Sequence, residues 1–339
     1  MAEVVGSSPT LRTSNHALNF GWILRVILYK KGNCPMSNKP KPATVAEKIR
    51  YLEEFVDLDK YLTENHNDSE KIVAYFKENH SRYRLFYNGK GNMHFIVSKD
   101  GKTFSYDDMY YQPDVAISYA KPGGKVLELG SGQGNNLMHL AQAHPDMEFY
   151  GMDLFPAELK KKPANLTIRK QNYTSMPDIP DNTFEVVYAI ETIVYNDSEM
   201  KDKLMAEVRR VLKPGGHFLV WDYATAYPFE TYSRELQTAM TICAHGGAFA
   251  QVETREEWKG HYDGAGFKTV AMNDLTDLCM PDLTRMQKHF DLVMAHPLRA
   301  KIIFRTMPRN YTVNLIAGWI AYNLVKEHVG NYMEWIMQK

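Results

Sequence analysis

The residues best placed for chemistry lie near the middle of the chain. An apolar run from Val126 to Leu129 carries Glu128 and is followed at once by three glycines: Gly130, Gly132 and Gly134. Glycines at a strand-to-helix turn let backbone N–H groups approach a ligand closely, and a helix N-terminus favours negative charge. The next apolar run ends in Asp153, about 20 residues further on, where a carboxylate can bind both hydroxyls of a ribose. This spacing predicts a site for a cofactor that contains a ribose.

Alternating strands and helices must position these side chains. The first strands are predicted at 126–129, 147–153, 166–169, 184–190 and 218–223. Asn135 and Asn136 are expected to cap the first helix of the alternation, because Asn is a favourable N-cap residue. A second helix has an apolar stripe, begins at Asp197 and is expected to stop at the Lys-Pro-Gly-Gly block of 213–216.

The C-terminal part supplies two more predicted strands, 267–272 and 332–337, with helices at 226–250 and 253–266 before them. Roughly sixty residues separate the two strands, far beyond the usual connection of about six residues. Helical patterns occur in this stretch at 283–294 and 315–326. Long connections with their own secondary structure are typically lids or binding elements.

Together these elements predict an α/β fold, a doubly wound, mostly parallel sheet of seven strands. It would occupy residues 121–339, with a helical insertion at about 277–329. Residues 36–120 are expected to form an N-terminal helical cap, with helices near 45–56, 68–76 and 106–120. Residues 1–35 are interpreted as a non-core extension.

That extension contains an apolar run at 20–29 with Arg25 in its middle. Ten residues are too few to cross a bilayer, which needs about 20. Two interpretations remain: a short amphipathic anchor, or a start-site artefact with Met36 as the true initiator. The start-site artefact is the favoured interpretation of residues 1–35. For the whole protein a cytoplasmic location is expected, with a peripheral position at a membrane as the alternative.

Composition excludes several classes of function. Lys+Arg and Asp+Glu both number 40, so no basic excess indicates a nucleic-acid partner. Cys34, Cys243 and Cys279 are far apart and odd in number, and the twelve histidines show no metal-ligand spacing. A reducing compartment and no bound metal are therefore expected.

Five sequence blocks in order resemble the class I S-adenosylmethionine (SAM) methyltransferases. They are E-L-G-S-G-Q-G, Y-G-M-D, Q-N-Y-T-S-M-P, D-N-T-F-E-V-V-Y-A-I-E and R-R-V-L-K-P-G-G-H-F-L-V. The resemblance implies SAM as the cofactor. The residues that it implies for binding are Glu128, Gly130, Gly132, Gly134, Asp153, Leu154, Asn172, Tyr173, Ala189 and Ile190.

Within that family the chain is most similar to the sterol C-methyltransferase-like group, which includes tocopherol and prenyl diphosphate C-methyltransferases. The similarity covers about residues 69–337 and rests on four places: 72–95, 171–177, 188–192 and the long insertion. Two positions differ from the group's pattern. Asn88-Gly-Lys-Gly91 replaces Gly-Trp-Gly, and Tyr195 stands where a histidine is expected, so a sterol substrate does not follow from the similarity.

The resemblance assigns each part of SAM to particular residues. Glu128 and the glycine loop would hold the methionine part, which Ala189 and Ile190 would line. Asp153 would bind the ribose hydroxyls. Asn172 would meet the adenine amino edge, with Tyr173 nearby, although Asn172 is also suited to an Asx turn.

Glu191 is the predicted catalytic residue. It follows an apolar strand and is expected to face the acceptor. Methylation of an alkene leaves a carbocation, which a carboxylate can stabilise and deprotonate, while aromatic faces add cation–π attraction. The aromatic candidates are Tyr188, Tyr195, Trp221, Tyr223 and Tyr227. The alternative is that Glu191 only holds loop amides or a substrate hydroxyl.

The function predicted is SAM-dependent methylation of a small, lipophilic acceptor, with C-methylation favoured; a homo-oligomer is compatible with it. N- or O-methylation of a polar small molecule, an NAD-dependent oxidoreductase and a silent SAM-binding partner are the alternatives. The oxidoreductase is disfavoured because the glycines read G-x-G-x-G and no Tyr-x-x-x-Lys pair is suitably placed. Arg299, Arg305 and Arg309 could bind an anionic head group, but a solvated helix face is favoured.

Overall fold

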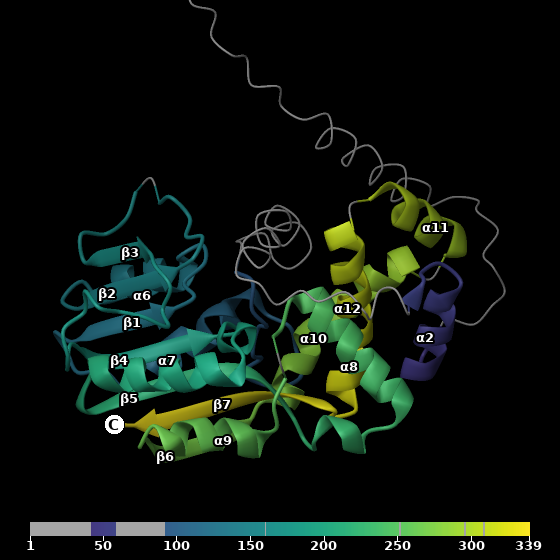
Figure 1. The fold of residues 1–339 in the computed structure, drawn as a ribbon. Coiled ribbons are helices and arrows are strands. Elements are labelled where there is room, and N and C mark those ends of the chain that lie inside the picture. The colour runs from purple at the N-terminus through teal and green to yellow at the C-terminus, as the bar shows by residue number, and fades with distance from the viewer. Residues whose placement is uncertain (1–41, 59–91, 160, 251, 295, 308) are drawn as a thin grey trace, which may run out of the picture.

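A single seven-stranded sheet forms the centre of the molecule (Figure 1). The computed structural model describes residues 42–58, 92–159, 161–250, 252–294, 296–307 and 309–339. The strands are β1 (Lys125–Leu129), β2 (Glu148–Asp153), β3 (Leu166–Lys170), β4 (Phe184–Ile190), β5 (Leu212–Thr225), β6 (Lys268–Asp274) and β7 (Gly330–Gln338). Their order is β3-β2-β1-β4-β5-β7-β6, and only β7 runs antiparallel to its neighbours. The predicted doubly wound α/β fold is confirmed.

The sheet order creates a crevice beside β1. β1 pairs with β2 on one side and with β4 on the other, so the connections from β1 and β4 leave in opposite directions. In open α/β sheets ligands bind outside the carboxyl ends of strands at such a switch point. Glu128 lies in register with Tyr188 of β4 and Gly151 of β2, which places it next to this crevice.

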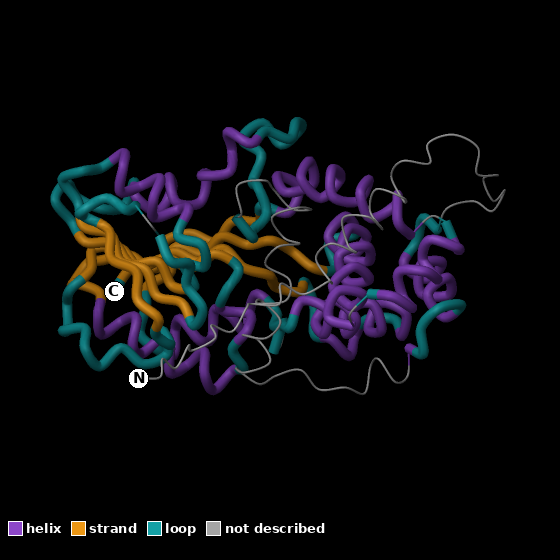
Figure 2. The backbone as a smooth tube through the Cα atoms, turned by 90° about the horizontal axis from the view of Figure 1, so that it is seen from above, coloured by secondary structure: helices purple, strands orange, loops and turns teal. Residues whose placement is uncertain are grey.

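Helices cover both faces of the sheet (Figure 2). α7 (Ser198–Val211) and α9 (Arg255–Gly264) pack on the face to which Leu127 and Leu129 point. α6 (Asn135–Ala143), α5 (Tyr111–Ile117) and α10 (Thr276–Met294) pack on the face of Val126. Since successive residues of a strand point to opposite faces, a sheet covered on both sides has strands that are apolar throughout.

A second body, made only of helices, lies beyond the carboxyl ends of the strands (Figure 1). It contains α2 (Val45–Glu53), α8 (Arg234–Gly247), α11 (Pro297–Thr306) and α12 (Arg309–Lys326), together with the end of α10. α12 is buried or half-buried from Thr312 to Val325. A Cβ on Gly246 of α8 would lie 2.3 Å from the Ala317 Cβ, so glycine at 246 allows α8 and α12 to pack this closely.

The part of the chain predicted as an N-terminal cap contributes to both bodies. α2 begins with a capping box of Thr44 and Glu47 and packs against the helical body. The segment predicted as one helix at 106–120 is a short 3-10 helix, η1 (Tyr106–Tyr110), followed by α5 beside the sheet. The predicted helix at 68–76, residues 83–91 and the extension at 1–35 lie outside the described residues.

Two local predictions were wrong. α6 is capped not by an asparagine side chain but by Gly134, which has a φ of 72° and makes no side-chain cap. The Lys213–Gly216 block does not stop α7: the helix ends at Val211, and the block lies inside β5, where the pairing with β4 shifts register. Gly215 has a φ of 76°, a left-handed conformation that glycine adopts easily and that this irregular part of the strand requires.

The short helices η2 (Ile193–Tyr195) and η3 (Phe229–Thr231) follow β4 and β5. α11 lies between the two helices that were predicted in the insertion and was not predicted itself. Within the described ranges, no helix combines the length and hydropathy that a bilayer span requires.

Candidate functional site

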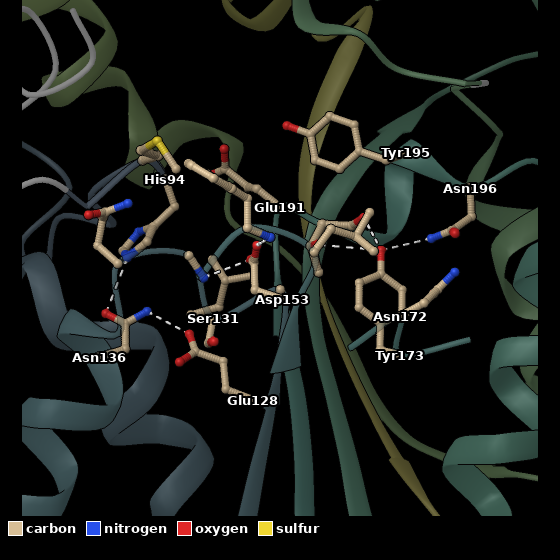
Figure 3. Close-up of a pocket in the computed structure, with 18 of the residues that line it drawn as sticks. His94, Glu128, Ser131, Asn136, Asp153, Asn172, Tyr173, Glu191, Tyr195 and Asn196 are labelled. Atoms are coloured by element: carbon tan, nitrogen blue, oxygen red, sulfur yellow. Dashed lines mark hydrogen bonds between the residues drawn. The ribbon is translucent and has the colours of Figure 1, made fainter. Parts of the chain in front are cut away.

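A cavity of about 320 Å³ lies at the carboxyl ends of β1, β2 and β4 (Figure 3). It is lined by Asn92–His94, Glu128, Gly130–Gln133, Asn135, Asn136, Asp153–Phe155, Asn172, Tyr173, Ile190–Thr192, Tyr195–Asp197, Met200 and Ala250. Eight of the ten predicted cofactor residues and Glu191 are among them. Figure 3 shows His94, Asn136 and Glu128 along one wall, with Asn172, Tyr173 and Asn196 on the opposite one.

Two of the predicted residues do not line this cavity. Ala189 is fully buried and packs in the core between the sheet and α7, because alternation turns it away from the face of Ile190. Gly134 is the N-cap of α6, and a Cβ there would lie 2.6 Å from the Ile168 Cδ1. Its glycine is required by the backbone conformation and by this packing.

The glycine loop is held against the end of β2. The Asp153 carboxylate accepts hydrogen bonds from the backbone N–H groups of Gly132, at 2.8 Å, and Phe155, at 2.6 Å. At Gly130, with a φ of 69°, a Cβ would lie 2.1 Å from the Thr192 Oγ1. The loop from β1 and the loop from β4 therefore meet so closely that only glycine fits at 130.

One wall of the cavity is a chain of polar side chains that starts at Glu128. Glu128 is 3% exposed, and its Oε1 accepts a hydrogen bond from the Asn136 amide at 2.9 Å. The Asn136 Oδ1 accepts in turn from the Asn92 amide at 3.0 Å and lies 3.5 Å from the His94 Nε2. Burial raises the pKa of Glu128 to about 8 and lowers the pKa of His94. Burial thus favours the protonated form of Glu128, and a cation beside it would favour the carboxylate.

The wall fits a ligand that carries polar groups. Among the described residues, the Ser131 Oγ and the Glu128 Oε2 are buried and make no hydrogen bond of normal geometry. The Tyr188 hydroxyl interacts with the same Glu128 carboxyl and opposes part of its pKa increase. Buried polar groups are nearly always hydrogen-bonded in native proteins, so these atoms are suited to the ammonium and carboxylate of an amino-acid moiety.

The opposite wall is built around Tyr173. Its hydroxyl donates to the Thr192 carbonyl at 2.8 Å and accepts from the Asn196 amide at 3.0 Å. Burial raises the Tyr173 pKa to about 12. Asn172 forms the Asx turn that its sequence allowed, since its Oδ1 accepts from the backbone N–H and hydroxyl of Thr174. The turn uses the side-chain oxygen of Asn172, but it uses neither N–H group of the side-chain amide.

Glu191 lies between the cavity and the segment that precedes the sheet. Its backbone has a φ of 48°, unusual for a residue other than glycine, and its N–H donates to the Trp221 carbonyl at 2.7 Å. The Oε1 atom accepts from the Phe95 N–H at 2.6 Å, and the Oε2 atom accepts from the Tyr223 hydroxyl at 2.5 Å. Burial raises the pKa of Glu191 to about 8, and the charge of Asp222 acts in the same direction.

Asp222, which the sequence did not single out, fixes the loop that carries Glu191. Its Oδ2 atom accepts from the backbone N–H groups of Ile193 at 2.9 Å and Val194 at 3.0 Å. Asp222 is fully buried, and burial raises its pKa to about 6. The sequence did contain a signal for Asp222, because this residue follows the apolar run of β5. The carboxyl ends of adjacent parallel strands meet at one edge of a sheet, so Asp222 could be expected near the end of β4.

The aromatic surround differs from the predicted set. Tyr195 lines the cavity, but Tyr188 and Trp221 are fully buried and Tyr227 is 65% exposed. Phe249 stacks on Tyr223, with ring centroids 5.4 Å apart, and lies 5.9 Å from Tyr195. Phe95 contacts Tyr223 edge-on at 5.6 Å. The aromatic wall near Glu191 therefore includes Phe95, Tyr195, Tyr223 and Phe249.

In the part of the chain that the structure describes, no group of three or more His, Cys, Asp or Glu side chains is arranged to hold a metal ion. The ionisable side chains that line the cavity are carboxyls, one histidine and two tyrosines. The other polar side chains of the lining are amides and hydroxyls. What the site offers is a tight glycine loop, two carboxyls suited to cationic groups, and an aromatic wall beside one of them.

Comparison with known proteins agrees with this chemistry. Residues 127–220 match the family model of a methyltransferase domain. A sterol 24-C-methyltransferase of Gibberella zeae is 26% identical over 265 residues, which are 71% of this chain and 66% of that protein. The match thus spans about two thirds of that relative's length.

Solved structures share the fold. A cyclopropane synthase of Mycobacterium tuberculosis has a TM-score of 0.64 at 13% identity, over 81% of this chain and 100% of that one. The geranyl diphosphate C-methyltransferase of Streptomyces coelicolor, in complex with Mg²⁺, geranyl diphosphate and S-adenosylhomocysteine, has a TM-score of 0.54 at 13% identity. It matches over 78% of this chain and 97% of that one. At this level of identity the likeness is one of fold.

Proposed function

Because the chain is a class I SAM-dependent methyltransferase, we propose that it methylates a carbon atom of a small, lipophilic acceptor. The observation that carries the proposal is the position of Glu191. Its carboxyl lines the cofactor cavity and lies against an aromatic wall. A carboxyl and aromatic faces at one place are what a developing carbocation requires.

Different residues of the cavity would bind different parts of the cofactor. Glu128 and the glycine loop would hold the methionine part, Asp153 the ribose hydroxyls, and Asn172 and Tyr173 the adenine. SAM supplies an electrophilic methyl group on a sulfonium, which needs positioning more than activation. Positioning of reacting groups can lower a barrier by several kcal/mol.

Glu191 would act on the acceptor after methyl transfer. Its carboxylate would stabilise the positive charge on the acceptor carbon and then accept the neighbouring proton, which restores a double bond. Tyr223 donates a hydrogen bond to the Glu191 Oε2 and so fixes the carboxyl in one orientation. The ring of Tyr195, which lines the cavity, would add cation–π attraction of about 0.5–2 kcal/mol.

The relatives support a carbon acceptor. The curated relative from Gibberella zeae is named for methylation at a sterol carbon, and the Streptomyces coelicolor structure for C-methylation of geranyl diphosphate. A phosphoethanolamine N-methyltransferase of Plasmodium falciparum, 27% identical over 45% of this chain, is the reason to test a polar acceptor as well.

The test uses SAM labelled with carbon-13 in its methyl group. The protein is incubated with a crude lipid extract, and in parallel with an unsaturated sterol, geranyl diphosphate and phosphoethanolamine. The product's methyl signal in NMR separates C–CH₃ from N–CH₃ and O–CH₃ by chemical shift. The proposal predicts a C–CH₃ product from a lipophilic acceptor, and labelling of phosphoethanolamine alone would overturn it.

A further inference from the structure

Exposed aliphatic side chains gather at one end of the helical body. Leu298 and Ile302 of α11 are 59% and 43% exposed, and Leu292 near the end of α10 is 52% exposed. Single exposed apolar residues are ordinary, but several together mark an interaction surface. Figure 1 shows α11 on the far side of the helical body from the sheet, so this surface is separate from the cofactor cavity.

α11 has two distinct faces. Ala300 and Ile303 are buried against the helical body. Leu298 and Ile302 lie one turn apart on the opposite face. Lys301 and Arg305 are exposed beside them, each three residues from one of the two aliphatic positions. The exposed face of α11 thus combines aliphatic and basic side chains.

The stretch of sequence that contains α11 carries only basic charges. No Asp or Glu occurs between Asp291 and Glu327, whereas that stretch contains Arg299, Lys301, Arg305, Arg309 and Lys326. Asp291 is directed into the helical body, since its Oδ1 accepts hydrogen bonds from Gln287 and from the indole of Trp319. The Asp291 carboxylate is therefore engaged inside the helical body.

Contacts at the α11 surface help to keep the helix in place. A guanidinium nitrogen of Arg299 donates to the Leu292 carbonyl at 3.0 Å, which joins the end of α10 to the start of α11. The Lys301 ammonium lies 5.8 Å from the centre of the Phe55 ring. Leu292, Leu298 and Ile302 are thus presented by a fixed helix pair.

We propose that the α11 surface, defined as Leu292, Leu298, Lys301, Ile302 and Arg305, docks on a membrane that contains anionic lipids. An interfacial helix buries its aliphatic side chains among acyl chains, while its basic groups meet anionic head groups. A protein partner would need matching acidic side chains around an aliphatic patch. A lipid surface offers negative charge and hydrocarbon together without such matching. The inference does not depend on methyl transfer.

The test is flotation of the full chain with vesicles of phosphatidylcholine alone or mixed with phosphatidylserine. Leu298→Ser/Ile302→Ser removes the aliphatic part, and Lys301→Gln/Arg305→Gln removes the charges. Val270→Ser/Met272→Ser is the matched control, because these two side chains are also exposed, at 47% and 44%, but lie on β6. Thermal midpoints of all variants verify folding.

The proposal predicts binding to the mixed vesicles, weaker binding at high salt, and at least a tenfold loss in each α11 variant with no loss in the control. Binding that persists in both α11 variants would overturn it and assign the membrane contact to another segment. No binding of the parent chain to anionic vesicles would also overturn it. A dimer in solution that Leu298→Ser/Ile302→Ser dissociates, without vesicle binding, would identify a second copy as the occupant instead.

Discussion

The carboxylate of Glu191 accepts a hydrogen bond of 2.6 Å from the backbone N–H of Phe95, a residue 96 positions earlier in the chain. The bond joins the end of β4 to the segment that precedes the sheet. Tyr223 donates to the other oxygen of the same carboxyl. Glu191 therefore has a structural role, which was the alternative drawn from the sequence, at the same place where we propose its catalytic role.

The first prediction concerns protons. With a pKa of about 8, Glu128 and Glu191 are mostly protonated at about pH 7 in the ligand-free protein. The ammonium and sulfonium of SAM favour the charged carboxylates, so SAM binding should release protons at this pH. SAM affinity should accordingly rise as the pH rises toward 8.

Calorimetry in buffers of different ionisation enthalpy measures the release. Glu191→Gln and Glu128→Gln should each reduce the number of protons released, because each removes one titrating group. At about pH 9 the release should nearly vanish, because both carboxyls are then charged before SAM binds. Proton uptake on binding, or a release that neither variant changes, would show that these carboxyls do not face the cofactor.

The second prediction separates backbone strain from close packing. Gly130 and Gly215 both have positive φ values, 69° and 76°, but only at Gly130 would a Cβ meet another atom, at 2.1 Å. Gly215→Ala should cost about 1–2 kcal/mol of unfolding free energy, the strain of a left-handed residue. Gly130→Ala should add about 1–3 kcal/mol of overpacking and abolish SAM binding. Urea denaturation measures both; equal costs would mean that the Thr192 contact can relax.

The third prediction concerns the ribose. Asp153→Ala should weaken SAM binding by about 1–3 kcal/mol, because ribose hydroxyls and two loop amides lose their acceptor. Asp146→Ala, at an exposed turn before β2, is the control and should bind as the parent does. NAD should bind neither protein. Titration calorimetry decides, and an unchanged SAM affinity in Asp153→Ala would remove Asp153 from the site.

The sequence predicted those parts of the site that depend on local patterns. The apolar runs of the sheet, the glycine loop and Asp153 could be read because strand ends and turn glycines are encoded within a few residues. The position of Glu191 could be read for the same reason. What it could not reveal were partners distant in sequence, such as the Phe95 amide and the fit of Thr192 against Gly130.

Two errors have related physical causes. Asn136 was interpreted as a cap, but its side chain donates to Glu128 on the same wall of the cavity, and Gly134 supplies the turn. The Lys213–Gly216 block has the composition of a helix stop, yet pairing with β4 draws it into β5. Ala189 was predicted to line the cofactor together with Ile190, but its side chain lies in the core, because adjacent residues of a strand face opposite sides.

The most direct test of C-methylation is the turnover of Glu191→Gln on the acceptor that the labelled-SAM experiment identifies. Glutamine keeps the size, and its amide can accept from the Phe95 N–H and donate to the Tyr223 hydroxyl, but it cannot accept the proton or oppose a carbocation with charge. The account predicts that the thermal midpoint changes little and that SAM affinity falls only by the loss of one charge contact, while turnover falls by about a hundredfold or more. Near-parental turnover in Glu191→Gln would contradict the carbocation mechanism and favour a nucleophilic nitrogen or oxygen acceptor.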